Sequence, residues 1–180
     1  MPTEHEYKYV ISLDFAKDYD HEALKSESDS FLKIKQGYLS FSKGMTARIR
    51  CQTFINKDQW VYTFKQKVGN RVIEIEKKID KRDGKDLWSV AVAKLKKTRY
   101  IIDNNGMIWE LDLFRNGNNL YFIQAEVEML EGSKRPKNIP DLFKDYVIYE
   151  VPLDDDRFAN KRLGEVEYAT DLYQTIMEKK

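Results

Sequence analysis

The sequence predicts an α+β fold that is mainly antiparallel β. Three observations carry this prediction: polar and apolar side chains alternate with a period of two along most of the chain, turn-forming residues separate these stretches, and helical spacing is confined to a few segments. Several stretches also carry like charges on one face. Closing the sheet into a barrel with these faces inward would give a polar lumen, and the helices could cover the apolar outer face.

The predicted strands are short segments with β-branched or aromatic residues at alternate positions. They cover residues 3–11, 36–42, 45–52, 59–68, 71–79, 98–103, 107–114, 120–130 and 146–151. The turn signals Lys43-Gly44, Gly69-Asn70 and Asn104-Asn105-Gly106 join neighbouring strands. Such short connections favour hairpins, and therefore antiparallel pairing.

Two amphipathic helices are predicted, with a third segment left undecided. Helical spacing of apolar residues follows Asp83-Gly84 as far as Leu95, and it returns from Glu165 to Met177. The lysine run 94–97 is then expected to be the solvated end of the first helix, with contact between Lys97 and a substrate as the alternative. Residues 20–34 could add a shorter helix, which the pattern does not decide.

Composition places the chain among globular, single-domain proteins, with one domain over residues 1–180. We expect neither a signal peptide nor a membrane span, and a single cysteine agrees with a reducing compartment, so a cytoplasmic protein is expected. The formal charge of +1 argues against a nucleic-acid binder, which usually needs a basic surplus.

Charges of one sign recur in pairs on single strand faces. For any one strand, a solvated outer face is the ordinary explanation, but repeated pairs are harder to explain because like charges on one face repel. The acidic pairs are Glu4 with Glu6, Glu74 with Glu76, Glu110 with Asp112, and Glu126 with Glu128; the basic pairs are Arg48 with Arg50, Lys65 with Lys67, and Lys97 with Arg99 if that strand begins early enough. Paired acids suit a divalent cation, and paired bases suit phosphate.

A barrel that encloses these faces would bring both kinds of pair together. Glu4 and Glu6 would then bind a metal, while Lys8 faces an anionic ligand beside them. Hard oxygen ligands without histidine or cysteine clusters favour Mg²⁺ or Mn²⁺ over Zn²⁺. The residues alone therefore predict a metal-assisted site for a phosphate-rich ligand.

The chain resembles the CYTH family of triphosphate tunnel metalloenzymes, in particular its small stand-alone bacterial triphosphatases. The E-x-E-x-K signature stands at Glu4, Glu6 and Lys8. The further matches, in family order, are "QGYLS" at 36–40, "RIR" at 48–50, "YTFKQK" at 62–67, "EIEKKI" at 74–79, "KKTRY" at 96–100, "WELDLF" at 109–114, "AEVEM" at 125–129 and "DDRFANKRLG" at 155–164. The resemblance implies an eight-stranded antiparallel barrel, closed or nearly closed, that forms a tunnel.

The resemblance also implies a role for each charged position. Metal ligands would be Glu4, Glu6, Asp112, Glu126 and Glu128; triphosphate contacts would be Lys8, Arg48, Arg50, Lys65, Lys67, Arg99 and Lys161; and Glu74, Glu76 and Glu110 would line the tunnel. Lys8, Glu6 and Arg50 are the expected catalytic residues. Arg71 lies out of step with the family arrangement and is expected to face away from the lumen.

The expected reaction is hydrolysis of a small-molecule triphosphate with Mg²⁺ or Mn²⁺, in which the metal lowers the pKa of an attacking water. Inorganic tripolyphosphate is the first choice of substrate, because no base-reading insertion is evident. A thiamine or nucleoside triphosphatase, a class IV adenylate cyclase and a non-catalytic polyphosphate-binding module remain open. No nucleic acid or membrane partner is expected, and a homodimer is kept open.

Overall fold

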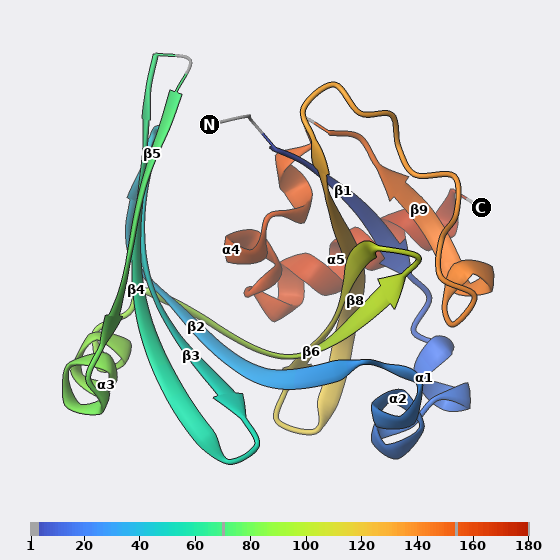
Figure 1. The fold of residues 1–180 in the computed structure, drawn as a ribbon, viewed down its shortest axis with the longest axis horizontal. Coiled ribbons are helices and arrows are strands. Elements are labelled where there is room, and N and C mark those ends of the chain that lie inside the picture. Colours follow the sequence, from blue (N-terminus) through green and yellow to red (C-terminus); the bar gives the residue numbers. More distant parts are fainter. Residues whose placement is uncertain (1–3, 70, 154, 180) are drawn as a thin grey trace.

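The computed structural model describes residues 4–69, 71–153 and 155–179, and it folds them into one curved antiparallel sheet with helices on both faces (Figure 1). The strands are β1 (Glu4–Ile11), β2 (Ser30–Ser42), β3 (Met45–Phe54), β4 (Lys57–Val68), β5 (Arg71–Ile79), β6 (Ala93–Asn104), β7 (Met107–Asn116), β8 (Asn119–Leu130) and β9 (Val147–Val151). The helices are α1 (Phe15–Asp18), α2 (His21–Glu27), α3 (Lys81–Ser89), α4 (Asn160–Leu163) and α5 (Val166–Glu178), with 3₁₀ turns η1 (Lys144–Tyr146) and η2 (Asp156–Phe158).

The sheet is an open trough, so the prediction of a closed eight-stranded barrel is not confirmed. Its nine strands run in the order β5-β4-β3-β2-β6-β7-β8-β1-β9, with β5 and β9 at the two edges. Closure would require β5 to pair across the opening, but the strand pairs only with β4 and is exposed along nearly its whole length. Figure 1 shows the arm formed by β4 and β5 standing apart from β1 and β9.

Each of the nine predicted strands corresponds to an observed strand, most with shifted ends, and the antiparallel class is confirmed. The early start of β6 at Ala93 matters most for the site, because Leu95 and Lys97 then belong to a strand and not to the end of a helix. Leu95 packs against the apolar cluster under α5, and this tertiary contact explains why its helical spacing after Leu87 was misleading. The helix predicted over 165–177 is confirmed as α5.

The undecided segment 20–34 splits between α2 and the start of β2. Asp20 is the N-cap of α2, because its carboxylate accepts a hydrogen bond of 2.9 Å from the Ala23 amide. None of the described helices is long and apolar enough to cross a lipid bilayer.

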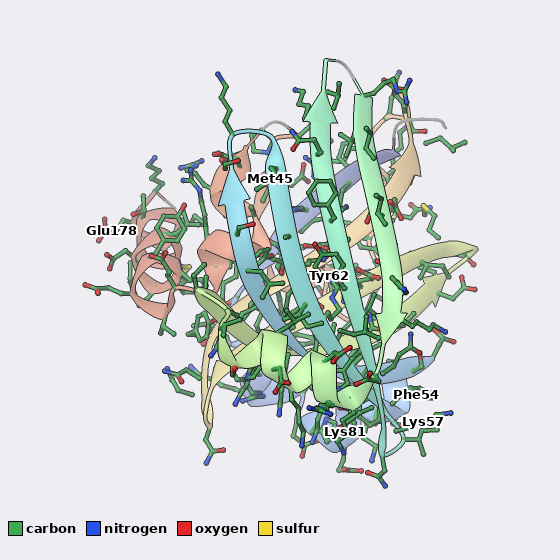
Figure 2. All side chains as sticks on the ribbon, turned by 90° about the vertical axis from the view of Figure 1, so that its left-hand side faces the viewer. Met45, Phe54, Lys57, Tyr62, Lys81 and Glu178 are labelled. Carbon is green, nitrogen blue, oxygen red and sulfur yellow. The ribbon has the colours of Figure 1, made fainter. Side chains whose placement is uncertain are left out.

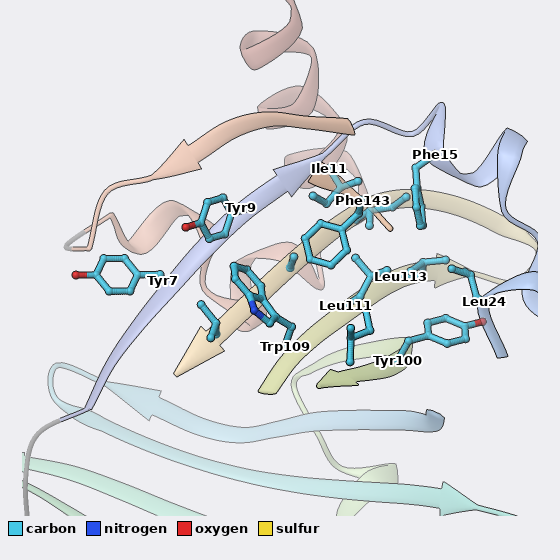
Figure 3. Packing of buried hydrophobic residues seen from close by; sticks show 14 residues of the cluster. Tyr7, Tyr9, Ile11, Phe15, Leu24, Tyr100, Trp109, Leu111, Leu113 and Phe143 are labelled. Carbon is cyan, nitrogen blue, oxygen red and sulfur yellow. The ribbon is translucent and has the colours of Figure 1, made fainter. Parts of the chain in front are cut away.

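Two apolar clusters cover the outer, convex face of the trough. The larger one packs the outward side chains of β1, β6, β7 and β8 against α1, α2 and Phe143, and Figure 3 shows Trp109 at its centre. The indole of Trp109 lies 5.4 Å from the ring of Tyr9 and 5.7 Å from that of Phe143. The smaller cluster joins Trp60 to α3, which lies across the outer face of β3 and β4 (Figure 2).

A third cluster fills one end of the concave face and determines where a ligand can enter. Here α5 and η2 pack on inward side chains such as Tyr38, Leu95 and Phe122. The rest of the concave face carries the charged positions of the same strands. The fold therefore seals one end of the trough with apolar packing and leaves the charged part open to solvent.

Candidate functional site

The concave face contains a groove of about 760 Å³ that collects charged side chains from both arms of the trough. Its charged lining residues are Glu6, Arg48, Arg50, Lys65, Arg99, Glu110, Glu126 and Glu128. A smaller hollow of about 220 Å³ adjoins it, since Arg48, Lys65 and Asn160 line both, and the hollow adds Lys8 and Lys161. Most of the predicted site residues therefore meet in one place.

Strand register brings these residues together. Lys8 lies opposite Glu126 and Glu6 opposite Glu128 in the pairing of β1 with β8. Arg99 lies opposite Asp112 in the pairing of β6 with β7. Residues directly opposite in an antiparallel pair share a face, so the period of two along each strand carries its charges to the same concave surface.

Glu126 and Glu6 form a carboxylate pair at the centre of the groove. Burial, together with the charge of Glu6 and a hydrogen bond to it, raises the pKa of Glu126 to about 7. Burial acts in the same direction on Glu6, but the hydrogen bond with Glu126 and the ammonium of Lys8 outweigh it and lower the pKa of Glu6. The two carboxyl groups thus share one proton near neutral pH.

Lys8 and Gln124 hold this pair from two sides. The Lys8 Nζ lies 3.5 Å from Glu6 Oε2 and 4.0 Å from Glu126 Oε1. Gln124 donates a hydrogen bond of 2.5 Å from Nε2 to Glu126 Oε1. Both contacts are made to carboxylate oxygens, and they hold the two carboxyl groups beside each other.

Below the carboxylate pair lies a buried ionic cluster of Lys97, Asp112 and Arg99. Arg99 donates to both carboxylate oxygens of Asp112, at 2.7 Å from Nε and 2.7 Å from Nη2. Lys97 donates to Asp112 Oδ2 and, at 2.9 Å, to Asn160 Oδ1. Burial alone would raise the pKa of Asp112, but the two cations reverse this and lower it to about 2. Asp112 therefore stays ionised with both oxygens occupied.

Arg99 links this cluster to the acids of the groove. Its Nη1 forms an ion pair with Glu110 Oε2, and its Nη2 lies 3.7 Å from Glu126 Oε2. The pKa of Glu110 is raised by burial, and the charge of Arg99 opposes the shift only in part. Because three acids surround Arg99, they largely neutralise its positive charge, and its guanidinium is less available to an anionic ligand in this arrangement.

Arg48 and Arg50 differ from Arg99, because no described carboxylate forms an ion pair with either. Gln36 accepts a hydrogen bond of 2.7 Å from Arg50 Nε and donates one of 2.6 Å to the Tyr38 hydroxyl, which orients the guanidinium. Burial and the nearby charges of Arg48 and Arg99 lower the pKa of Arg50 to about 10. The Nε of Arg48 is buried without a hydrogen-bond partner. Two partly desolvated cations without acidic partners are suited to an anion.

The remaining predicted residues lie farther out. Lys65 forms an ion pair of 3.2 Å with Glu74, and Glu76 accepts a hydrogen bond of 3.2 Å from Thr63, so these acids lie on the β5 arm. Lys67 shares the inward face of β4 but is exposed and does not line the groove. Lys161 reaches the smaller hollow from α4, whereas Glu128 lines the open side of the groove.

The structure gives a partial fit to a divalent cation. Among the residues it describes, no group of three or more Asp, Glu, His or Cys side chains is arranged to hold a metal ion. The side chain of Glu4, predicted as a ligand, lies outside the described part. Two carboxyl groups that share a proton are nevertheless a donor pair that a hard cation could join by displacing that proton. The donor chemistry of Glu6 and Glu126 therefore fits Mg²⁺ or Mn²⁺.

Sequence reasoning missed three residues that shape the site, Gln36, Gln124 and Asn160, and left the place of Lys97 open. Lys97 had a signal, since it shares a strand face with Arg99 two positions on, but the competing helical spacing placed it on a solvated end. The uncharged residues carried no signal, because an isolated Gln or Asn on a strand face is ordinary. Gln36 accepts from Arg50 of β3 and Asn160 of α4 accepts from Lys97 of β6, so only the tertiary structure shows these contacts, while Gln124 bonds to Glu126 on its own strand.

The fold is shared with solved structures of several proteins. The hypothetical protein NE1496 matches with a TM-score of 0.55 and 23% identity over 90% of this chain and 97% of its own. HpAC1 from Hippeastrum, a proposed adenylyl cyclase with a dominant triphosphatase activity, matches at 0.52 and 19% over 72% and 80% of the two chains. The adenylate cyclase candidate bh2851 from Bacillus halodurans matches at 0.50 and 18% over 71% and 81%.

No protein-family profile and no curated protein matches the sequence. At these identities the structural likeness shows the fold alone, and the chain has a CYTH-like fold.

Proposed function

We propose that the chain hydrolyses the terminal phosphoryl group of a triphosphate with the help of Mg²⁺ or Mn²⁺. One observation carries the proposal: Arg48 and Arg50, which form no ion pair with any carboxylate that the structure describes, lie in the same groove as the carboxyl pair Glu6 and Glu126. An anion that also brings a divalent cation would satisfy both halves of this groove. The fold shared with proteins described as adenylyl cyclases and a triphosphatase supports the same reading.

The cations would bind the phosphate chain. Arg48 and Arg50 would make the first contacts because they have no competing carboxylate, and Gln36 would keep Arg50 in place. Lys8, Lys65 and Lys161 line the adjoining hollow, where the ends of the phosphate chain could reach. Arg99 would contact the phosphates once Glu110 or Glu126 turns away from it to bind the metal. Lys67 would add positive charge at the edge of the groove.

The acids divide into two roles. Glu6 and Glu126 would hold the cation, with Glu128 as a further ligand from the open side; Glu4 remains a ligand proposed from sequence. The cation would neutralise charge on the phosphates and lower the pKa of the attacking water. Asp112 has both oxygens on Lys97 and Arg99, so we give it the role of orienting Arg99 in place of metal binding. Glu74, Glu76 and Glu110 would line the groove and set its charge.

In the chemical step, water attacks the terminal phosphorus and the bond to the bridging oxygen breaks, which releases phosphate. The charge that develops on the leaving oxygen would be stabilised by Arg50 and Arg48. Lys8 lies within 4.0 Å of the carboxylates of both Glu6 and Glu126. Its role would be to hold Glu6 and contact the phosphate chain.

The direct test is release of phosphate from tripolyphosphate by the purified protein with Mg²⁺ or Mn²⁺, and with the metal chelated. We expect metal-dependent release, and a loss of about a hundredfold or more in kcat for Glu126→Gln. Glu131→Gln, at the exposed end of the same segment, is the matched control and should keep the wild-type rate. Wild-type kinetics in a folded Glu126→Gln protein would contradict the proposal.

The same assay separates the alternatives. The neighbours described as adenylyl cyclases make cyclic AMP formation from ATP the second candidate, and cyclic AMP as the main product would support it. Tight binding of tripolyphosphate without turnover under either metal would instead support a polyphosphate-binding module.

A further inference from the structure

The two edges of the sheet differ in how well they are covered. At one edge, β9 is five residues long, α5 packs against it, and Arg135 donates a hydrogen bond of 2.5 Å to its Val151 carbonyl. At the other edge, β5 is nine residues long, and eight of these residues are exposed. Among the described strands β5 pairs with β4 alone, so the backbone groups on its other side have no strand partner.

The strand β5 lacks most of the features that protect an edge from pairing. Proteins usually protect an edge strand with proline, a β-bulge, a short length, or a covering helix or loop. β5 contains no proline, and its register with β4 runs from Arg71 to Ile79 without a bulge. The helix α3 that follows β5 lies across the outer face of β3 and β4 (Figure 2). A bare edge of this length is a template for another strand.

Apolar side chains on the outer face of β5 continue beyond the area that α3 covers. Trp60 and Ile79 pack with α3, but Ile73 and Ile75 belong to none of the described apolar clusters. Their exposed fractions are 40% and 56%, and Ile75 lies opposite the half-buried Phe64 of β4. A strand that paired along this edge would extend the outer face and bury part of both isoleucines.

The charged residues of β5 are separated by sign along the strand. Glu74 and Glu76 come first, and Lys77 and Lys78 follow. In an antiparallel pair of two β5 strands, the acidic half of one strand lies beside the basic half of the other. A parallel pair would instead place like charges together. The charge pattern of β5 therefore complements a second copy of β5 in the antiparallel direction.

One register satisfies both the charges and the apolar side chains. With Glu74 opposite Lys78 of the partner subunit, Ile73 lies opposite Ile79 of the partner subunit, and each contact occurs twice. The two Glu76 side chains then meet at the axis, where each has a Lys78 from both strands two positions away. The current contacts leave room for this pairing, because 44% of the Glu74 side chain is exposed beside its ion pair with Lys65.

We infer that β5 is a dimer interface: two copies of the chain pair their β5 strands antiparallel about a two-fold axis, and one continuous sheet passes through both troughs. A two-fold interface must complement itself, and the change of sign along β5 meets this requirement. The inference does not depend on the proposed hydrolysis. It gives a defined interface to the homodimer that the sequence left open.

The test uses two double variants that each give β5 a single sign of charge. Glu74→Lys, Glu76→Lys makes the strand basic, and Lys77→Glu, Lys78→Glu makes it acidic. We expect sedimentation equilibrium to give the mass of two chains for the wild type and of one chain for each variant alone, because like charges then meet across the pair. An equimolar mixture of the two variants should return to the mass of two chains, since a basic strand meets an acidic one.

A matched control reverses charges away from the edge. Lys33→Glu, Lys35→Glu changes two exposed lysines of β2, three strands from β5 in the sheet, and should keep the mass of two chains. Thermal melting followed by circular dichroism establishes that each variant is folded. A wild type that sediments as one chain, single variants that stay dimeric, or a mixture of folded variants that stays monomeric would each overturn the inference.

Hydrogen exchange of the wild type gives a second readout that needs no variant. Amides on the free side of β5 donate to the partner strand in the dimer, so they should exchange about tenfold more slowly at high protein concentration than after dilution to single chains. Amides of β3 are the internal reference, because this strand is paired on both sides within one chain. A dimer in which the β5 amides exchange equally fast at both concentrations would place the interface elsewhere and overturn the inference.

Discussion

At the scale of single residues, the groove depends on a proton held between Glu6 and Glu126. The hydrogen bond joins the two carboxyl groups, and burial makes two full negative charges there costly. The pKa of Glu126, about 7, lies above its ordinary value of 4.5, so the folded protein holds this proton more tightly than the unfolded chain. This contribution to stability is complete below pH 4.5 and is lost as the pH rises through 7.

We expect the metal-free protein to lose roughly 3 kcal/mol of unfolding free energy between pH 4.5 and pH 7.5 through this group. Glu126→Gln cannot ionise and should lose much less over the same range. Urea unfolding at the two pH values in the presence of a chelator measures the difference. Glu131→Gln is the exposed control and should follow the wild type; parallel curves for wild type and Glu126→Gln would rule out the shared proton.

Lys97 illustrates a second residue-scale effect, a buried cation that holds its neighbours in place. Its side chain is fully buried between Asp112 and Asn160, and burial lowers its pKa. Removing one partner of a buried ion pair leaves the other charge uncompensated, which costs more than the pair contributes. Arg99 still compensates part of the charge of Asp112, so the loss is moderated.

For Lys97→Met we expect a loss of about 3 kcal/mol in unfolding free energy. Lys96→Met removes the adjacent exposed lysine of β6 and should change stability by less than about 0.5 kcal/mol. Denaturant unfolding of both variants tests the burial of Lys97. A similar small effect in both would place Lys97 in solvent, as the helical interpretation of residues 94–97 had it.

These residues also mark the limit of sequence reasoning. Strand periodicity correctly brought Glu6, Lys8, Arg50 and Glu126 to one face, because side-chain direction follows from the backbone alone. Periodicity carries no information on burial or on partners from other strands. Two sets of contacts could therefore not be predicted: the ion pairs that engage both carboxylate oxygens of Asp112, and the hydrogen bonds made by Gln36 and Asn160.

At the scale of elements, α3 fixes the arm of the trough that carries Arg48 and Arg50. The helix begins at the Asp80 cap, whose carboxylate accepts a hydrogen bond of 2.9 Å from the Asp83 amide. Gly84 lets the helix lie directly on the Trp60 ring, since a Cβ at this position would come within 2.4 Å of the ring. Trp60 and Ile49 form the outward core behind the two arginines.

Gly84→Ala should destabilise the protein by about 1–3 kcal/mol, because the added methyl overlaps the indole and outweighs the better helix propensity of alanine. Lys85→Ala, at an exposed position of the same helix, should be nearly neutral. Thermal unfolding of the two variants checks this packing. Stabilisation by Gly84→Ala would mean that α3 stands farther from Trp60.

At the scale of the whole molecule, the sheet is open beside β5, and charges of the same sign lie near one another on its concave face. The turn signals predicted the hairpins β2–β3, β4–β5 and β6–β7, but not the pairing of β2 with β6 or of β1 with β8 and β9. The gap beside β5 was not predicted either, because closure depends on the curvature of the whole sheet and on what fills its concave side. Arg48 and Arg50 bring two like charges together in the groove, which opposes folding, and a ligand that binds only the folded state relieves this cost.

Tripolyphosphate with Mg²⁺ should therefore raise the melting temperature more than sulfate at equal ionic strength. The expected reason is specific binding by mass action, which at a ligand concentration a hundred times Kd adds about 2.7 kcal/mol. Differential scanning calorimetry measures both shifts. Equal shifts would indicate screening of the charges and no specific site.

The central claim is that the groove binds a triphosphate through Arg48 and Arg50, which pair with no described carboxylate, and the most direct measurement is kcat/KM for phosphate release by Arg50→Gln. We expect a fall of about a hundredfold in the folded variant, because Arg50 contacts the phosphates as charge develops on the leaving oxygen. Arg71→Gln removes an exposed arginine from the outward face of β5 and should remain within about twofold of the wild type. A folded Arg50→Gln protein with the same kcat/KM as Arg71→Gln would contradict the account.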